Sequence, residues 1–200
     1  EGMKVEEIFA ALDMLEKEGF LKNFKEKVCI GQGFRGKNGV LGVGRCTAGF
    51  THHLDGCPPT EQEMYEFLKD YIMETETRRL ICDLACIPAA AGQEQKRADY
   101  IKAWLQRQGA ENVYEDQAGN ICWLWSRKKE HLTVFTAHMD TVFSEDTQLQ
   151  IREEDGRLYC PGIGDDTANL ACMLMAAAEA ARSGWIPEHG ILFAATVGEE

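Results

Sequence analysis

The sequence has no apolar run of the roughly 18 residues that a membrane-spanning helix needs. Residues 1–7 also lack the basic-then-apolar order of a secretory signal. No internal repeat and no low-complexity tract is evident along the chain. These absences favour a folded protein that has no membrane partner.

Basic residues are scarce relative to acidic ones, because 21 Lys and Arg stand against 33 Asp and Glu, a net charge of −12. Such a chain repels the phosphates of nucleic acids and the anionic headgroups of lipids. Hydrophobic residues make up 44% and charged residues 27%, as in ordinary globular domains. We therefore expect a globular protein that binds no nucleic acid.

The eight cysteines include no C-x-x-C pair and are scattered along the chain. Several lie inside apolar segments, for example Cys122 and Cys172, where a free cysteine behaves as a small core residue. This distribution predicts a reduced, cytoplasmic protein rather than a secreted one held by disulfides.

Residues 1–58 are predicted to form a small amino-terminal extension of unknown role. Apolar residues at three- and four-residue steps predict a helix over 3–27. The many glycines of residues 31–49 predict turns or a glycine-rich hairpin. Within them, Gly31–Gly36 matches the G-x-G-x-x-G of dinucleotide-binding folds, but no helical pattern follows, so the motif is weak.

Three further residues of this extension, His52, His53 and Cys57, are metal-ligand types. Adjacent histidines in a polar loop are more typical of a solvated surface, and no fourth ligand is evident. We therefore expect no metal site there.

From about residue 59 onward, strands alternate with helices, which predicts an α/β domain over residues 59–200. Thr60 and Glu63 form a capping box that opens its first helix. Strand 132–137 is apolar enough to be buried on both faces of a sheet. We expect a layered sheet with helices on both faces. The expected elements are helices over 60–84, 93–108 and 167–182, strands over 120–126, 132–137 and 190–197, and a hairpin of 149–152 with 157–160.

The first of three polar clusters is the His138 loop, residues 138–142, which directly follows strand 132–137. His138 and Asp140 share a face on extended backbone, so the carboxylate is placed to orient a metal-binding imidazole. A strand-end histidine bonded to a turn-forming aspartate fits this pair equally well.

The second cluster is the Asp165 turn, residues 160–166, which has two adjacent carboxylates just before helix 167–182. Asp165 and Asp166 at a helix start are typical N-caps, which favour the positive end of the helix dipole. The same arrangement supplies oxygen ligands to a divalent cation. On this motif alone both interpretations stay open.

The third cluster is the carboxyl-terminal pair, Glu199 and Glu200, which follows the apolar strand 190–197. These glutamates are either plain surface residues or a metal ligand beside a general base. Two clusters follow strands and one precedes a helix, so all three can meet at the carboxyl edge of one sheet, where α/β folds bind ligands. One histidine and several carboxylates without cysteine suit a catalytic zinc or another divalent ion.

The clusters resemble the zinc-dependent peptidases and deacylases that include glutamate carboxypeptidase, aminoacylase, acetylornithine deacetylase, succinyl-diaminopimelate desuccinylase and peptidase T. The likeness extends over about residues 64–200 and includes Gly92-Gln93-Glu94 and Gly119-Asn120 besides the three clusters. It implies a zinc exopeptidase-like catalytic domain, incomplete in this sequence. The implied reaction is hydrolysis of the amide bond of a small peptide or an N-acyl amino acid.

Residue by residue, the resemblance implies that His138 is a ligand of one zinc and that Asp140 orients it. Asp165 is similar to the carboxylate that bridges two zinc ions. Glu199 looks like the general base, and Glu200 looks like a ligand of the second zinc. Cobalt or manganese can substitute for zinc in such sites.

Further features of the family concern the neighbours of the bridging carboxylate and segments that have no counterpart in this sequence. Many members have a cis peptide between the counterparts of Asp165 and Asp166, and a Lys where this sequence has Thr167. The family also has a further acidic ligand, a ligating histidine and a lid domain, through which members form homodimers. We therefore expect the amino-terminal part of a longer enzyme.

Two other functions are compatible with the sequence. One is a non-catalytic binding module that has kept the fold and lost the chemistry. Downstream sequence that contains the further acidic and histidine ligands would favour the enzyme, and downstream sequence without them would favour the binding module. The other is nucleotide binding through Gly31–Gly36, which would survive deletion of residues 60–200. The exact substrate and the oligomeric state are not determined by this sequence.

Overall fold

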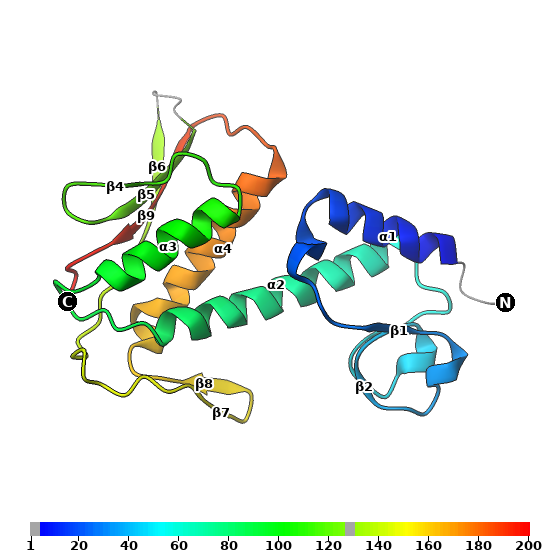
Figure 1. Cartoon of the computed structure of the whole chain (residues 1–200). Coiled ribbons are helices and arrows are strands. Elements are labelled where there is room, and N and C mark those ends of the chain that lie inside the picture. The colour runs from blue at the N-terminus through cyan, green and yellow to red at the C-terminus, as the bar shows by residue number, and fades with distance from the viewer. Residues whose placement is uncertain (1–4, 127–130) are drawn as a thin grey trace. The chain divides into compact units, whose positions relative to one another are not determined.

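The computed structural model describes residues 5–126 and 131–200 of the chain (Figure 1). The chain has two compact units that divide between residues 76 and 77. Among the described residues, no helix combines the length and the apolar character needed to cross a membrane.

The division between the units falls inside helix α2 (Glu61–Ala85), whereas the sequence predicted a division at 58/59. The first half of α2 contributes Leu68 and Ile72 to a buried cluster that also contains Leu15. This half of the helix therefore belongs to the core of the first unit, which is why the unit extends past the predicted boundary.

Helix α2 begins where the capping box predicted. The backbone N–H of Thr60 donates to Glu63 Oε2 at 2.7 Å, and the backbone N–H of Glu63 donates to Thr60 Oγ1 at 3.2 Å. Two backbone donors at the start of the helix thus have partners without any contact to the rest of the chain.

The first unit contains three parallel strands in the order β1-β2-β3. Of the two predicted alternatives for residues 31–49, turns are present and a glycine-rich hairpin is wrong. Parallel strands cannot be joined by a tight hairpin turn. Here the chain returns through short 3₁₀ turns entered at Gly31 and Gly44, whose φ angles of 95° and 92° favour glycine. The elements that precede α2 are α1 (Val5–Lys17), β1 (Val28–Ile30), β2 (Gly39–Val43) and β3 (Phe50–Leu54).

Helix α1 ends at Lys17 and not at the predicted residue 27, because Gly19 adopts a left-handed φ of 81° and ends the helical run. Residues 3 and 4 of the predicted helix lie outside the described residues. The G-x-G-x-x-G motif of residues 31–36 is followed by β2 and not by a helix. Dinucleotide-binding folds place the phosphates at the helix that follows this motif, so the fold gives the nucleotide interpretation no support. His52 and His53 join no group of described residues arranged to hold a metal ion.

The second unit has a mixed four-stranded sheet in the order β4-β5-β9-β6, which confirms the α/β prediction (Figure 1). Strand β9 pairs in parallel with β6 and antiparallel with β5. Helix α3 contacts β5, and α4 contacts β6 and β9. The elements after α2 are α3 (Gln95–Arg107), β4 (Tyr114–Glu115), β5 (Ile121–Ser126), β6 (Leu132–His138), β7 (Arg152–Glu154), β8 (Arg157–Tyr159), α4 (Ala168–Ser183) and β9 (Gly190–Thr196).

Strand β6 lies at the edge of this sheet and, among the described residues, pairs only with β9. Leu132, Val134 and Phe135 are 55%, 48% and 48% exposed, so the prediction that this strand is buried on both faces is wrong. The carboxyl end of the strand is buried, because Ala137 is 6% and Met139 is 0% exposed. The packed end of β6 is therefore the end that carries the His138 loop.

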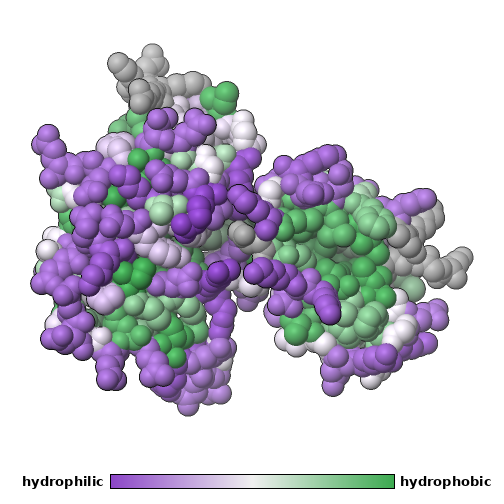
Figure 2. All heavy atoms as spheres, viewed as in Figure 1, coloured by the Kyte–Doolittle hydropathy of each residue, from purple (hydrophilic) through white to green (hydrophobic). Residues whose placement is uncertain are grey.

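An aromatic row crosses the sheet and ties three strands together. Trp123 of β5, Phe193 of β9 and Phe135 of β6 are partners in register, and their rings stack at centroid distances of 5.7 and 5.3 Å. Aromatic cross-strand pairs of this kind stabilise one register over its neighbours. On the face of the second unit seen in Figure 2, hydrophilic residues dominate.

We expect Leu174→Ala to destabilise the second unit, because Leu174 of α4 is only 1% exposed and its truncation leaves a cavity. The free energy of unfolding should fall by about 2–5 kcal/mol, measured by urea denaturation. Ile186→Ala is the control, since Ile186 is 75% exposed and its truncation should change the same quantity by less than about 0.5 kcal/mol. Equal losses in the two variants would contradict the assignment of the core.

Candidate metal centre

Strands β6 and β9 bring two of the predicted clusters together. They run in parallel with His138 opposite Thr196, and the backbone N–H of Met139 donates to the Thr196 carbonyl at 2.8 Å. Parallel neighbours end at the same edge of a sheet, which is where α/β folds bind ligands. The His138 loop therefore lies beside the carboxyl-terminal pair, Glu199 and Glu200.

The Asp165 turn reaches the same edge just before α4. Gly162 has a φ of 73°, and a Cβ at this position would lie 2.7 Å from Thr141 Cγ2 of the His138 loop. Only glycine therefore permits the close approach of these two segments. The peptide bond between Asp165 and Asp166 is cis, as the family resemblance implied.

The side chains of the three clusters converge on His138. Its Nε2 lies 3.2 Å from Asp165 Oδ1 and 4.0 Å from Glu199 Oε2. Two groups have ligand-type atoms within 4.8 Å of one another, His138 with Asp165 and Asp166, and His138 with Glu199 and Glu200. The imidazole side chain is only 10% exposed, whereas those of Asp165 and Glu199 are 82% and 64% exposed. The cluster is thus anchored on its histidine and open to solvent on its carboxylates.

Asp140 lies fully buried beneath His138. Its Oδ1 is 3.3 Å from His138 Nδ1, although the two are not aligned as a hydrogen bond, and its Oδ2 accepts the backbone N–H of Glu200 at 2.8 Å. Burial raises the pKa of Asp140, but the backbone N–H groups of Glu200 and Glu199 and the charge of His138 lower it more. The net pKa lies below the ordinary value, so a buried carboxylate faces both His138 and the backbone of Glu200.

The electrostatics of the cluster favour a cation. Burial lowers the pKa of His138, but its hydrogen bond with Asp165 and the charges of Asp140, Asp166 and Glu199 raise it more, so that it lies above the ordinary value. Several carboxylates thus surround one imidazole, and a divalent ion would offset their charge while replacing the proton on His138. Imidazole nitrogen with carboxylate oxygen and no sulfur is a donor set that suits zinc, so the residues present fit such an ion.

Asp166 is a candidate ligand that the sequence interpretation did not assign. Its Oδ2 accepts the backbone N–H of His138 at 3.3 Å, and its Oδ1 accepts the Asn169 side-chain amide at 2.6 Å. The sequence signal for a second ligand was the pair of adjacent carboxylates, but the resemblance gave a role only to Asp165.

Asn120 and Asp116 position the end of β9 and were also missed. Asn120 Oδ1 accepts the backbone N–H of Val197 at 3.0 Å, and Asn120 Nδ2 donates to Asp116 Oδ2 at 2.8 Å. Asp116 Oδ1 in turn accepts the backbone N–H groups of residues 118–120. The sequence signal that could have identified Asn120 is the Gly119-Asn120 dipeptide. It belongs to the family resemblance, but the resemblance gave it no role.

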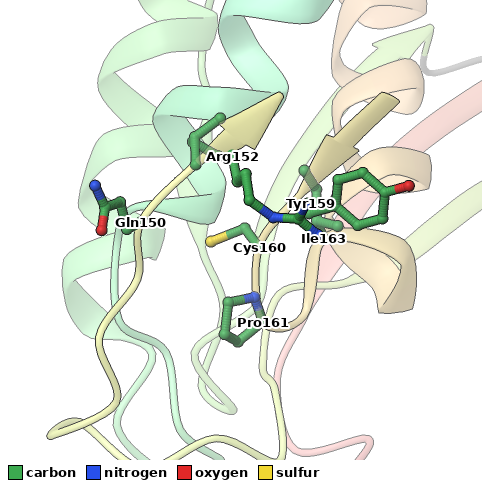
Figure 3. Close-up of a pocket in the computed structure, with 7 residues that line it drawn as sticks. Gln150, Arg152, Tyr159, Cys160, Pro161 and Ile163 are labelled. Atoms are coloured by element: carbon green, nitrogen blue, oxygen red, sulfur yellow. The ribbon is translucent and has the colours of Figure 1, made fainter. Parts of the chain in front are cut away.

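A pocket of about 590 Å³ lies beside the Asp165 turn and not over the carboxylates. Figure 3 shows Cys160 and Pro161, which begin the turn, lining this pocket with Arg152 and Tyr159 of the β7–β8 hairpin. The Arg152 guanidinium lies over the Tyr159 ring, 4.3 Å from its centroid. None of the described residues that line this pocket is a candidate ligand.

Several solved structures with a similar fold are peptidases. A tripeptidase from Staphylococcus aureus subsp. aureus Mu50 is 27% identical with a TM-score of 0.51, and the match covers 63% of this chain and 37% of that one. Aminopeptidase PepT from Bacillus cereus ATCC 10987 is 25% identical with a TM-score of 0.52 and the same two coverages of 63% and 37%. Human carnosine dipeptidase 1, at 16% identity and a TM-score of 0.52, shares the fold over 65% of this chain and 34% of its own.

This chain therefore spans little more than a third of the length of these structures. A comparison with curated proteins gives no match. Residues 134–200 match the model of peptidase family M20/M25/M40, a segment that contains His138, Asp165, Glu199 and Glu200. By sequence and by fold, the second unit thus resembles the amino-terminal part of the peptidases of family M20/M25/M40, which confirms the resemblance predicted from the three clusters.

Proposed function

We propose that the protein is a zinc-dependent peptidase that hydrolyses an amide bond of a small peptide with a metal-activated water. The observation that carries this proposal is the convergence of His138 with two pairs of adjacent carboxylates at the shared edge of β6 and β9. The family match over residues 134–200 and the likeness to a tripeptidase and an aminopeptidase support it.

Three residues are proposed to hold metal. His138 would be a ligand of one zinc, Glu200 would be a ligand of a second, and Asp165 would be a ligand shared between them. Asp166 lies within the same 4.8 Å group as His138 and Asp165, so we add it as a candidate ligand. The family resemblance implies a further acidic ligand and a ligating histidine, and this chain covers only part of its structural relatives.

Bound zinc ions would polarise the scissile carbonyl and lower the pKa of the attacking water. Glu199 is proposed as the general base that accepts a proton from this water and returns it to the leaving amine. Its carboxylate is 64% exposed and lies 4.0 Å from His138 Nε2, so it is free to face both water and substrate. Asp140 takes no part in proton transfer and instead fixes the orientation of His138.

The substrate class is proposed to be small peptides rather than N-acyl amino acids. Two solved structures, at 27% and 25% identity, are a tripeptidase and an aminopeptidase. Deacylation of N-acyl amino acids uses the same attack on an amide carbonyl, and a panel of di- and tripeptides beside N-acetyl amino acids would separate the two. The predicted cytoplasmic location and the predicted homodimer stay predictions.

We expect Glu199→Gln in the full-length protein to lower kcat by about 10²–10⁴-fold, because an amide cannot accept the proton of the attacking water. Peptide hydrolysis and bound zinc should be measured on the same samples, and the zinc content should be unchanged. Glu188→Gln removes an exposed acid ahead of β9 and should leave kcat as it is. A Glu199→Gln variant with full activity, or an active enzyme free of metal, would refute the proposed function.

We expect Asp140→Asn to weaken zinc binding by about 10–100-fold, because the neutral amide orients and polarises His138 less well than a carboxylate does. The dissociation constant is measured by titration with a competing chelator. Asp146→Asn, which neutralises an exposed acid of the following loop, is the matched control. Equal zinc affinity of Asp140→Asn and the wild type would show that Asp140 has no orienting role.

A further inference from the structure

Arg97 is the most deeply buried cation of the second unit among the described residues, with only 1% of its surface exposed. It lies in the first turn of α3, where the sequence predicted a helix and gave the residue no role. A charged side chain is seldom fully buried unless hydrogen bonds replace its water. The partners of its guanidinium therefore indicate what the residue is for.

The guanidinium contacts both segments that carry candidate metal ligands. Its Nη1 donates to the Met139 carbonyl at 2.8 Å and to Thr167 Oγ1 at 3.4 Å. Met139 stands between His138 and Asp140, and Thr167 directly follows Asp165 and Asp166. One nitrogen atom thus joins the His138 loop to the end of the Asp165 turn.

A third contact fixes the guanidinium itself. Arg97 Nη2 donates to the Ile87 carbonyl at 2.7 Å, just after the end of α2. Because the guanidinium is planar and rigid, holding one of its nitrogens fixes the direction of the other. Met139 and Thr167 are themselves 0% and 1% exposed, so water does not compete for these bonds.

The charge of Arg97 suits this position. Burial lowers its pKa to about 10, while the nearby Cys160 and Asp140 act in the opposite direction, so it remains a cation at neutral pH. Its positive charge interacts favourably with the negative charge of the buried Asp140 carboxylate. The two segments also bond each other directly, because Asp166 Oδ2 accepts the backbone N–H of His138 at 3.3 Å. Arg97 adds a buried bond to each segment from α3.

We propose that Arg97 is a positioning residue that sets the separation of His138 from Asp165 by holding Met139 and Thr167. It contacts neither substrate nor metal and acts through these two neighbours. The inference rests on the proposed zinc site, since its consequence is a change in metal affinity. The alternative is a purely structural role, in which Arg97 only ties α3 to the rest of the unit.

The test is a Co²⁺ titration of the full-length protein, because the visible spectrum of bound Co²⁺ reports ligand geometry as well as affinity. Arg97→Met keeps the length of the side chain and removes all three hydrogen bonds. We expect its dissociation constant for Co²⁺ to rise by about 10–100-fold, with an altered spectrum. Arg97→Lys should recover part of the affinity, because it keeps the cation and loses the planar fork. Arg107→Met, on the exposed end of the same helix, should match the wild type.

A structural role would give a different result. The melting temperature of Arg97→Met would fall while the folded protein bound Co²⁺ with wild-type affinity and spectrum, and this outcome would overturn the inference. Thr167→Val removes only one acceptor and keeps the volume, and we expect a several-fold rise in its dissociation constant. If Arg97→Met does not fold, wild-type behaviour of both Arg97→Lys and Thr167→Val overturns the inference.

Failure of the proposed function is distinguishable from failure of this inference. A wild-type protein that binds no Co²⁺, or a His138→Ala variant that binds it as well as the wild type, would overturn the proposed zinc site and the inference with it. Wild-type binding that is lost in His138→Ala but kept in Arg97→Met would overturn only the role of Arg97.

Discussion

The parallel pairing of β6 with β9 is the constraint on which the candidate centre depends. A shift of this pairing by one residue would turn His138 to the opposite face of the sheet and away from Glu199. The stacked row of Trp123, Phe193 and Phe135 opposes such a shift, because the three rings overlap only in the observed register. An apolar contact in the middle of the sheet thus determines a polar arrangement at its edge.

The candidate centre has an exposed layer of carboxylates above a dry layer of buried polar groups. Asp165 and Glu199 face solvent, whereas Asp140 is completely buried and has the backbone N–H of Glu200 as a donor. Hydrogen bonds are stronger and more directional where water is absent. The buried layer can therefore hold the geometry while the exposed carboxylates remain accessible to a cation and a substrate.

The features predicted correctly from sequence are those with local causes. The capping box at Thr60 needs only a hydroxyl and a carboxylate three residues apart, and the turn between β7 and β8 needs only Asp155-Gly156, both at positive φ. Two of the three candidate clusters follow strands directly and the third precedes a helix, so their meeting at one edge of the sheet could be expected from sequence.

The features that could not be predicted from the sequence depend on contacts between residues far apart along the chain. The glycine-rich segment of the first unit has no periodicity that separates a hairpin from parallel strands, so the order β1-β2-β3 was not predictable. The apolar composition of β6 is the same for a central strand as for an edge strand, and only the sheet order shows that Val134 and Phe135 are half-exposed. From the sequence alone, Arg97 cannot be distinguished from an ordinary basic residue of a helix. Its partners Met139 and Thr167 lie far along the chain, and only the fold brings them together.

Helix α2 shows why the amino-terminal extension is not a simple appendage. Its first half contributes Leu68 and Ile72 to the core of the first unit, and its second half contributes the buried Leu80 and Leu84 to the second. A chain cut at the predicted boundary of 58/59 would keep the helix but lose α1 and β1–β3, which leaves the apolar face of its first half without partners. The first unit therefore ends inside α2 because burial, and not the break in composition at Cys57-Pro58-Pro59, determines where a folding unit stops.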